Sequence, residues 1–347
     1  MFKLLPILII ATVLFPLTGQ AKTNDGSVCI LAGKTEETAT FAMLFAKDQG
    51  LLKNKNIQLK ILNINNRPIK PTKFYEVVYS KTKNKQETSL TKNCDFLVLS
   101  YEKILKQKQE TLNQFKLLYS SYYGTNYDTH FVISKNSNIQ SPKELLGKNV
   151  RLGQLGTMLA FKNMMAAEQL NPEQVMLLED DAVKMSDDLL KNKIAMGSTY
   201  FPTMQVALAS GDVKIFKKNI FSTFLKNPYP QSIILTNRQT LKNNPELISN
   251  FKVIMSDLLK TIEKSPMTFA KTLKTHTTEL GMASWNVSDA IIAKGDEHYS
   301  SINFIEENNS LDFKNRMISP SEIFILTQQS LIEAKFIHND LDLKVLF

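Results

Sequence analysis

Histidine and cysteine, which supply most metal ligands and many catalytic groups, are scarce in this chain. Its 347 residues include only two cysteines and four histidines. None of the histidines stands beside a serine, cysteine or aspartate in a recognisable nucleophile or metal motif. They are His130, His276, His298 and His338. We therefore expect no catalytic residue, no metal and no cofactor, and we interpret His130 as a core or hinge histidine.

Long apolar runs are equally rare, and the one that could matter lies at the start. Lys3 precedes an apolar run from Leu4 to Leu17, and the small residues Gly19 and Ala21 follow it. That order is typical of a secretory signal peptide cleaved after Ala21. The run has about 14 residues, fewer than the roughly 17 to 25 of a membrane-spanning helix. We expect residues 1–21 to be removed and the protein to be periplasmic.

The net charge of the chain does not indicate a nucleic-acid-binding protein. The formal net charge is +9, carried mainly by lysines spread along the whole chain. A nucleic-acid-binding protein would cluster such charge with aromatic residues or glycine, and an exported protein meets little nucleic acid. We interpret the excess as a solvated basic surface and expect no nucleic-acid partner.

The two cysteines, Cys29 and Cys94, form an even pair in a chain whose export would let a disulfide persist. They begin the first and third predicted strands, which are often neighbours in open sheets. We predict one structural disulfide between them. A reactive thiol or a metal site is the alternative, but neither cysteine has a histidine or a second cysteine at ligand spacing.

Strand-like and helical segments alternate along the chain, which predicts an α/β fold with mainly parallel sheets flanked by helices. The apolar or alternating segments of strand length span 28–33, 57–64, 94–100, 129–134, 175–179 and 232–237. The clearest helical segments between them span 38–52 and 159–169, and from Pro245 onward the sequence is almost entirely helical in pattern.

Two such α/β units predict two lobes. Lobe 1 is discontinuous, formed by residues 22–124 and 230–347 with a helical C-terminal part, and lobe 2 is formed by residues 125–229. We expect crossover strands near 123–130 and 221–232 to act as a hinge between the lobes.

Several segments follow one another along the chain: SPKELLGKNVRLG from Ser141, the turn GQLGT, STYFP ending at Pro202, ALASGDVKIF after it, and the helix NNPELISNFKVIMSDLLKTIEKSP. Their order resembles that of the nitrate, sulfonate and taurine type of periplasmic solute-binding protein. The resemblance covers most of the chain from Val28 to about Leu273. It implies a type II periplasmic binding protein-like fold and a monomer that delivers a small-molecule ligand to an ABC permease in the inner membrane.

Two loops are candidates for ligand contact. In GQLGT, the glycines allow close approach of the backbone and Thr157 can cap the following helix, so a carboxylate, sulfonate or phosphate fits there. The loop KTEET holds the corresponding place in the other lobe, where Glu36 and Glu37 either face solvent or favour an amine. With the aromatic residues at strand ends, the candidate ligand-binding residues are Thr35, Thr38, Tyr101, Tyr123, Gln154, Gly156, Thr157, Tyr200 and Phe201.

We therefore predict an exported substrate-binding protein that captures a small organic solute, which we expect to be anionic, and closes over it by a hinge motion. Each aromatic residue taken alone is better explained by core packing, whereas their recurrence at strand ends supports an organic ligand. Two other functions stay open: an enzyme on the same fold that acts on a small heterocyclic metabolite, and a binding protein that feeds a sensor.

Overall fold

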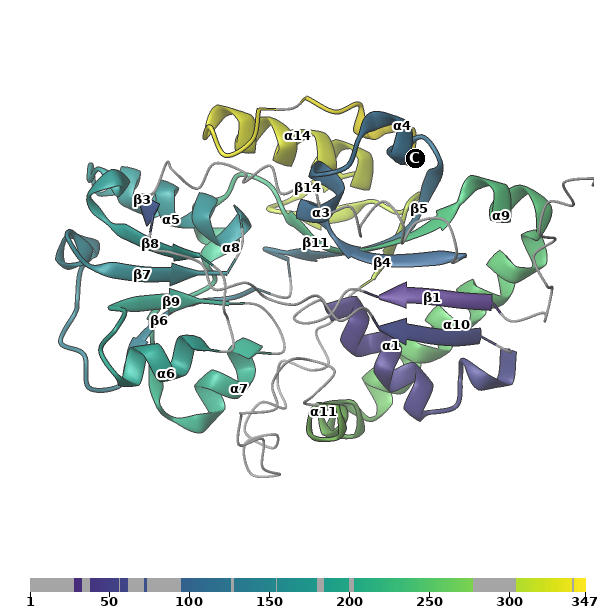
Figure 1. Ribbon diagram of the computed structural model, residues 1–347, viewed down its shortest axis with the longest axis horizontal. Coiled ribbons are helices and arrows are strands. Elements are labelled where there is room, and N and C mark those ends of the chain that lie inside the picture. The colour runs from purple at the N-terminus through teal and green to yellow at the C-terminus, as the bar shows by residue number, and fades with distance from the viewer. Residues whose placement is uncertain are drawn as a thin grey trace, which may run out of the picture.

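The computed structural model describes residues 28–32, 38–55, 57–61, 72–73, 95–125, 128–153, 155–179, 184–199, 203–276, 304–338 and 340–347. These residues form two lobes side by side, each built on a six-stranded sheet (Figure 1). The predicted two-lobed α/β architecture is confirmed.

The first sheet belongs to the lobe that holds the earliest strands. Its order is β12 (Ile305–Glu306), β5 (Phe115–Tyr123), β11 (Tyr229–Asn237), β4 (Phe96–Ser100), β1 (Val28–Ala32) and β2 (Ile57–Ile61). Strand β1 is parallel to both β2 and β4, and Ile30 pairs with Phe96. The predicted adjacency of the first and third predicted strands is confirmed. Cys29 lies in β1, whereas Cys94 lies outside the described residues.

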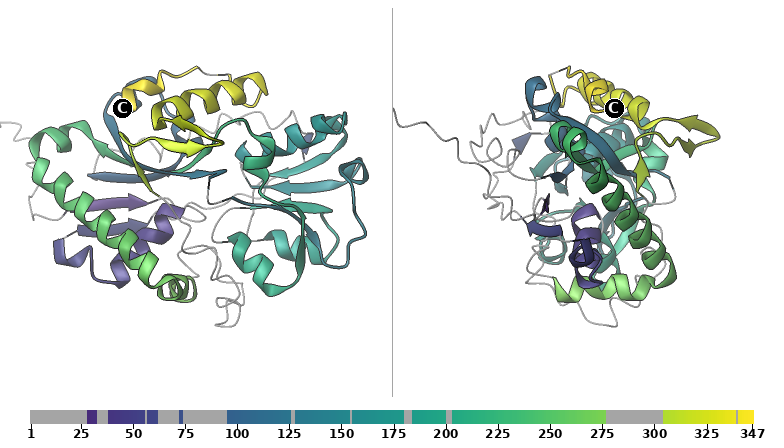
Figure 2. Two further views of the ribbon diagram at one scale, coloured as in Figure 1. Left: turned by 180° about the vertical axis from the view of Figure 1, so that it is seen from behind. Right: turned by 90° about the vertical axis from the view of Figure 1, so that its right-hand side faces the viewer.

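Helices cover both faces of the first sheet. They are α1 (Thr38–Asp48), η1 (Lys53–Lys55), α3 (Tyr101–Leu105), α4 (Gln109–Leu112), α9 (Arg238–Asn243), α10 (Pro245–Lys264), α11 (Pro266–Thr275), α14 (Pro320–Glu333) and η5 (Leu343–Leu346). All but two of them, η1 and α9, bury apolar side chains. The long helix α10 crosses the back of this lobe (Figure 2), where Phe251 stacks on Phe96 with ring centroids 4.2 Å apart.

The second sheet has the order β10 (Val213–Lys217), β6 (Phe131–Ser134), β9 (Met196–Ser198), β7 (Asn149–Leu152), β8 (Met176–Glu179) and β3 (Thr72–Lys73). Helices α5 (Leu155–Ala167) and α8 (Ile220–Phe224) lie on one side of it, and α6 (Met185–Leu190) and α7 (Thr203–Ser210) on the other (Figure 1). Short 3-10 turns, η2 (Pro142–Leu145) and η3 (Pro172–Gln174), precede β7 and β8.

Both sheets are mixed rather than mainly parallel. In the first sheet the parallel strands β4, β1 and β2 form one edge, and β11, β5 and β12 continue the sheet through antiparallel pairs. In the second sheet the parallel strands β9, β7 and β8 form the centre, with antiparallel pairs to β6 and β10 on one side and to β3 on the other. Strands β5, β6 and β11 adjoin the places where the chain passes from one lobe to the other and returns. Strand β3 also departs from the predicted lobe boundaries, since Thr72 and Lys73 of the lobe 1 segment pair with β8.

The C-terminal part is less helical than its pattern predicted. Besides β12, it contains a two-stranded sheet of β13 (Leu311–Phe313) and β14 (Arg316–Ile318). The two residues between those strands, Lys314 and Asn315, both have positive φ, as a tight type I′ hairpin turn requires. Strands of three residues give too short an alternation to be recognised in sequence.

The crossovers between the lobes are held together by one buried carboxylate. Asp128 Oδ1 accepts the N–H of Phe221 at 3.0 Å, and Oδ2 accepts the N–H and hydroxyl of Ser222, both at 2.8 Å. Next to it, His130 Nδ1 accepts the N–H of Asn219 at 3.0 Å. The outgoing crossover, which includes Asp128 and His130, is thereby tied to α8 on the returning one, as expected of a hinge histidine.

We expect Asp128→Ala to lower the free energy of unfolding by about 3 kcal/mol, because it leaves several buried donors without an acceptor. Urea unfolding at pH 7 measures this. Asp212→Ala is the matched control, since Asp212 makes only a half-exposed ion pair with Lys135 and should cost less than about 1 kcal/mol. Equal losses for the two variants would show that Asp128 does not hold the crossovers.

Candidate functional site

The carboxyl ends of β4 and β7, one from each lobe, meet at a single buried contact. Glu102, the second residue of α3, follows β4 directly, and Gly156 lies in the first turn of α5, which follows β7. Glu102 Oε1 accepts the backbone N–H of Gly156 at 3.3 Å and the hydroxyl of Tyr229 at 3.1 Å. Ligands bind at the carboxyl ends of strands in open α/β folds, so this contact marks the candidate site.

Glu102 is an unusual carboxylate because it is only 9% exposed. Burial raises its pKa from 4.5 to about 7, although Lys106 and hydrogen bonds from Tyr229 and the backbone of Gly156 and Leu155 act in the opposite direction. Glu102 therefore exchanges its proton near neutral pH, and its charged form depends on the donors of α5.

Gly156 is required here by space. A Cβ atom at this position would lie 2.6 Å from the ring of Tyr229 and 2.8 Å from that of Phe221. Glycine thus lets the first turn of α5 approach the aromatic residues of the crossover closely enough to reach Glu102. The sequence predicted close approach of this backbone to a ligand; the described close approach is to protein side chains, and ligand contact at Gly156 stays a prediction.

Aromatic rings pack behind the contact. Tyr229 lies edge-on to Tyr101, with centroids 6.0 Å apart, and Tyr123 stacks on Phe221 at 5.0 Å. Tyr101 and Tyr123 are fully buried, and the Tyr101 hydroxyl donates to the carbonyl of Phe324 at 2.6 Å. These contacts are those of core packing, so a ligand-binding role for Tyr101 and Tyr123 stays a prediction.

A polar cluster lies at the start of α1. Thr38 Oγ1 donates to Gln231 Oε1 at 2.6 Å, and Ser121 Oγ donates to the same oxygen at 3.2 Å. The N–H of Ala39 donates to Ser232 Oγ at 3.3 Å. The first turn of α1 is therefore tied to β5 and β11, and the candidate Thr38 is buried within this network rather than separate from it.

The second lobe contributes buried hydroxyls with no partner within the described part of the chain. They belong to Thr199, directly after β9, and to Thr203, the first residue of α7. The side-chain oxygen of Gln205 likewise has no partner among the described residues. All three residues are almost fully buried. Buried polar groups are normally hydrogen-bonded, so these three atoms are available to a ligand or to water. Thr157 is fully buried as the third residue of α5, so the prediction that it caps this helix is wrong: the helix begins two residues earlier, at Leu155.

Four candidates, Thr35, Gln154, Tyr200 and Phe201, lie outside the described residues, as do Glu36 and Glu37. Their roles stay predictions. Sequence reasoning missed Glu102, Gln231 and Thr199. A charged or polar residue directly after a buried strand was the available signal for Glu102 and Thr199, whereas Gln231 lies inside a strand pattern and gave none.

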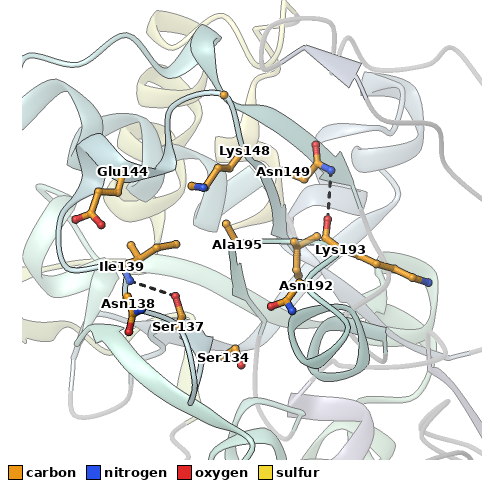
Figure 3. Close-up of a pocket in the computed structure, with 12 residues that line it drawn as sticks. Ser134, Ser137, Asn138, Ile139, Glu144, Lys148, Asn149, Asn192, Lys193 and Ala195 are labelled. Atoms are coloured by element: carbon orange, nitrogen blue, oxygen red, sulfur yellow. Dashed lines mark hydrogen bonds between the residues drawn. The ribbon is translucent and has the colours of Figure 1, made fainter.

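Of two hollows bordered by described residues, the larger lies elsewhere. It measures about 670 Å³ and lies at the amino ends of β7 and β9, where Asn149 donates to the carbonyl of Lys193 (Figure 3). A smaller one of about 240 Å³ lies between α5 and α14, bordered by Lys162, Tyr229 and Glu333. The larger hollow is at the wrong end of the strands for a ligand site of an open α/β sheet, so we favour the Glu102 contact.

Metal and membrane features are not found in the described ranges. No group of three or more His, Cys, Asp and Glu side chains there could hold a metal ion, and no helix there is long and apolar enough to cross a membrane. His276 Nε2 lies 2.9 Å from Asp48 Oδ1 and so joins α11 to α1.

Glu102 should make stability depend on pH. Its pKa is higher folded than unfolded, so the stabilisation it gives is complete below pH 4.5 and is lost as the pH rises through 7. Relative to Glu102→Gln, which cannot titrate, the wild type should lose about 3 kcal/mol of unfolding free energy between pH 4.5 and 8. Urea unfolding of both proteins across this range measures the difference. Parallel curves would show that Glu102 titrates as an ordinary exposed carboxylate.

Solved structures show where this fold occurs. The periplasmic aliphatic sulphonate-binding protein SsuA from Escherichia coli is 11% identical, with a TM-score of 0.63, and the match covers 92% of this chain and 96% of that one. The alkanesulfonate-binding protein SsuA from Xanthomonas axonopodis pv. citri, bound to MOPS, is 10% identical, with a TM-score of 0.61 and coverage of 90% and 94%. The desulfurization enzyme DSZB is 12% identical, with a TM-score of 0.55 and coverage of 91% and 95%.

At these identities the likeness shows the fold, which binding proteins and an enzyme share. A comparison with curated protein sequences finds no match. The family model described as NMT1/THI5 like matches residues 78–266. That range is more than half of the chain and includes α3, the crossovers and the whole of α5. The chain therefore belongs to the NMT1/THI5-like family.

Proposed function

We propose that this chain is an exported solute-binding protein of an ABC-type transporter, which captures a small organic solute between its lobes. The observation that carries the proposal is the meeting of the carboxyl ends of β4 and β7 at Glu102 and Gly156. Family membership and the binding-protein fold support it.

Capture works by closure of the lobes about the crossovers. Besides the Glu102 contact, two lysine side chains form hydrogen bonds between the lobes. Lys162 Nζ of α5 donates to the carbonyl of Ala334 at 3.1 Å, and Lys314 Nζ donates to the carbonyl of Leu225 at 3.2 Å. A few polar contacts of this kind can be exchanged at little cost as the lobes rotate, whereas the β5 and β11 strands stay paired. The closed form would then be recognised by a permease in the inner membrane.

Binding without catalysis is favoured by what two of the described histidines do. His130 accepts a backbone N–H in the crossover and His276 is paired with Asp48, so both have structural partners. The DSZB likeness keeps an enzyme on this fold as the second candidate. A sensor in place of the permease would use the same binding chemistry.

Removal of the signal peptide at residues 1–21, a periplasmic location, a monomeric state and the Cys29–Cys94 disulfide belong to the same proposal. The register that pairs Ile30 with Phe96 supports the disulfide, because it brings the starts of β1 and β4 side by side, which a disulfide requires.

A stoichiometric ligand should accompany the protein purified from its periplasm. Native mass spectrometry should show one small molecule per chain, lost on unfolding. Small-angle scattering should show a smaller radius of gyration when that molecule is added back to stripped protein, because the lobes close. Stripped protein without the molecule is the control. Conversion of the molecule to a product by catalytic amounts of protein would favour the enzyme instead.

Titration of the exported, unfolded protein with a thiol reagent should detect no free thiol before reduction and two after it, if Cys29 and Cys94 are bridged. Protein produced without residues 1–21 in a reducing cytoplasm is the control and should give two thiols from the outset. Two free thiols in the exported protein would remove the disulfide.

A further inference from the structure

The α5 N-terminus, where the sequence predicted an anionic group of the ligand, already holds a carboxylate of the protein itself. The N–H groups of a first helical turn attract negative charge. Here the N–H of Gly156 donates to Glu102, whose side chain comes from α3 on the first lobe. Glu102 is about nine-tenths buried, so its side chain is part of the protein interior at this helix N-terminus and is not a surface side chain that folds over it.

A ligand oxyanion at the same donors would meet two obstacles. It would have to take the N–H groups from Glu102, and it would place a second negative charge against a buried first one, which disfavours the ionised form of both. The cation that acts on Glu102 is Lys106, which follows it by one turn on the same segment.

The carboxyl end of β9, which pairs with that of β7, is followed by further polar atoms. The side-chain oxygens of Thr199, Thr203 and Gln205 have no partner among the described residues, and Glu102 Oε1 already accepts the Tyr229 hydroxyl. A carboxylate and an amide oxygen only accept hydrogen bonds, and the two hydroxyls can accept them too, so an N–H-bearing solute can satisfy the whole set.

We propose that Glu102 sets the specificity of this site: it excludes oxyanions from the α5 N-terminus and selects a neutral or cationic solute that presents N–H groups. The inference rests on the proposed binding function and replaces the anionic solute predicted from sequence. It also separates this chain from the structural neighbours named for sulfonate binding.

The test uses ethanesulfonate, a small sulfonate, with the full mature protein at pH 8, where Glu102 is ionised. Isothermal titration calorimetry compares the wild type with Glu102→Gln, which keeps volume and one acceptor, and Glu102→Ala, which empties the place. Equal concentrations of chloride control for ionic strength. Glu110→Ala, which removes an exposed carboxylate of α4, is the matched control.

We expect at least tenfold tighter sulfonate binding in one or both Glu102 variants than in the wild type, with Glu110→Ala unchanged. Circular dichroism checks that each variant is folded. If Glu102→Ala does not fold, the comparison of Glu102→Gln with the wild type decides the test. Equal affinity in wild type and variants, or no sulfonate binding by any folded variant, would overturn the inference. Neither result would test the proposed binding function, which is tested separately by the search for a co-purified ligand.

Discussion

The antiparallel pairing of β5 with β11 is the constraint on which the arrangement of the lobes depends. The chain leaves the first sheet at the end of β5 and re-enters it at the start of β11, and Tyr123 pairs with Tyr229 at that point. Both crossovers therefore start from one place, and the carboxylate of Asp128 ties them together again beyond it. Apart from β3, which an earlier segment adds at one edge, the second sheet is attached at this narrow base and can rotate as a unit, which is the geometry a hinge needs.

The pairing of β5 with β11 also positions the Glu102 contact. Tyr229 is the first residue of β11, and its ring fills the space that Gly156 leaves while its hydroxyl donates to Glu102. A buried carboxylate without partners would be costly, and here Tyr229 and Lys106 of the first lobe and the backbone of α5 in the second lobe act on it. Only the hydrogen bonds from α5 cross between the lobes, so these bonds depend on the relative position of the lobes and are sensitive to closure.

Much of the fold could be predicted because its signals are local. Continuous apolar runs correspond to β1, β4 and β6, and the helical pattern from Pro245 corresponds to α10, whose buried residues recur at helical spacing. Three features lacked such signals. The two-residue strand β3 and the hairpin of β13 and β14 are too short for periodicity, and the direction of β11 depends on where the chain returns, so the sheets are mixed rather than mainly parallel.

The ligand-binding role of the predicted site residues stays a prediction. The turn before α5 was identified as a place for an anionic group of the ligand, and in the structure the carboxyl group of Glu102 accepts the N–H of Gly156 there. That contact could not be read from the sequence, because Glu102 is 54 residues from Gly156 and belongs to the other lobe. Whether a helix N-terminus is open to a ligand depends on which side chains the tertiary fold brings to it. A local motif can therefore specify the electrostatic preference of a site, whereas the distant residue that satisfies this preference decides which ligands it accepts.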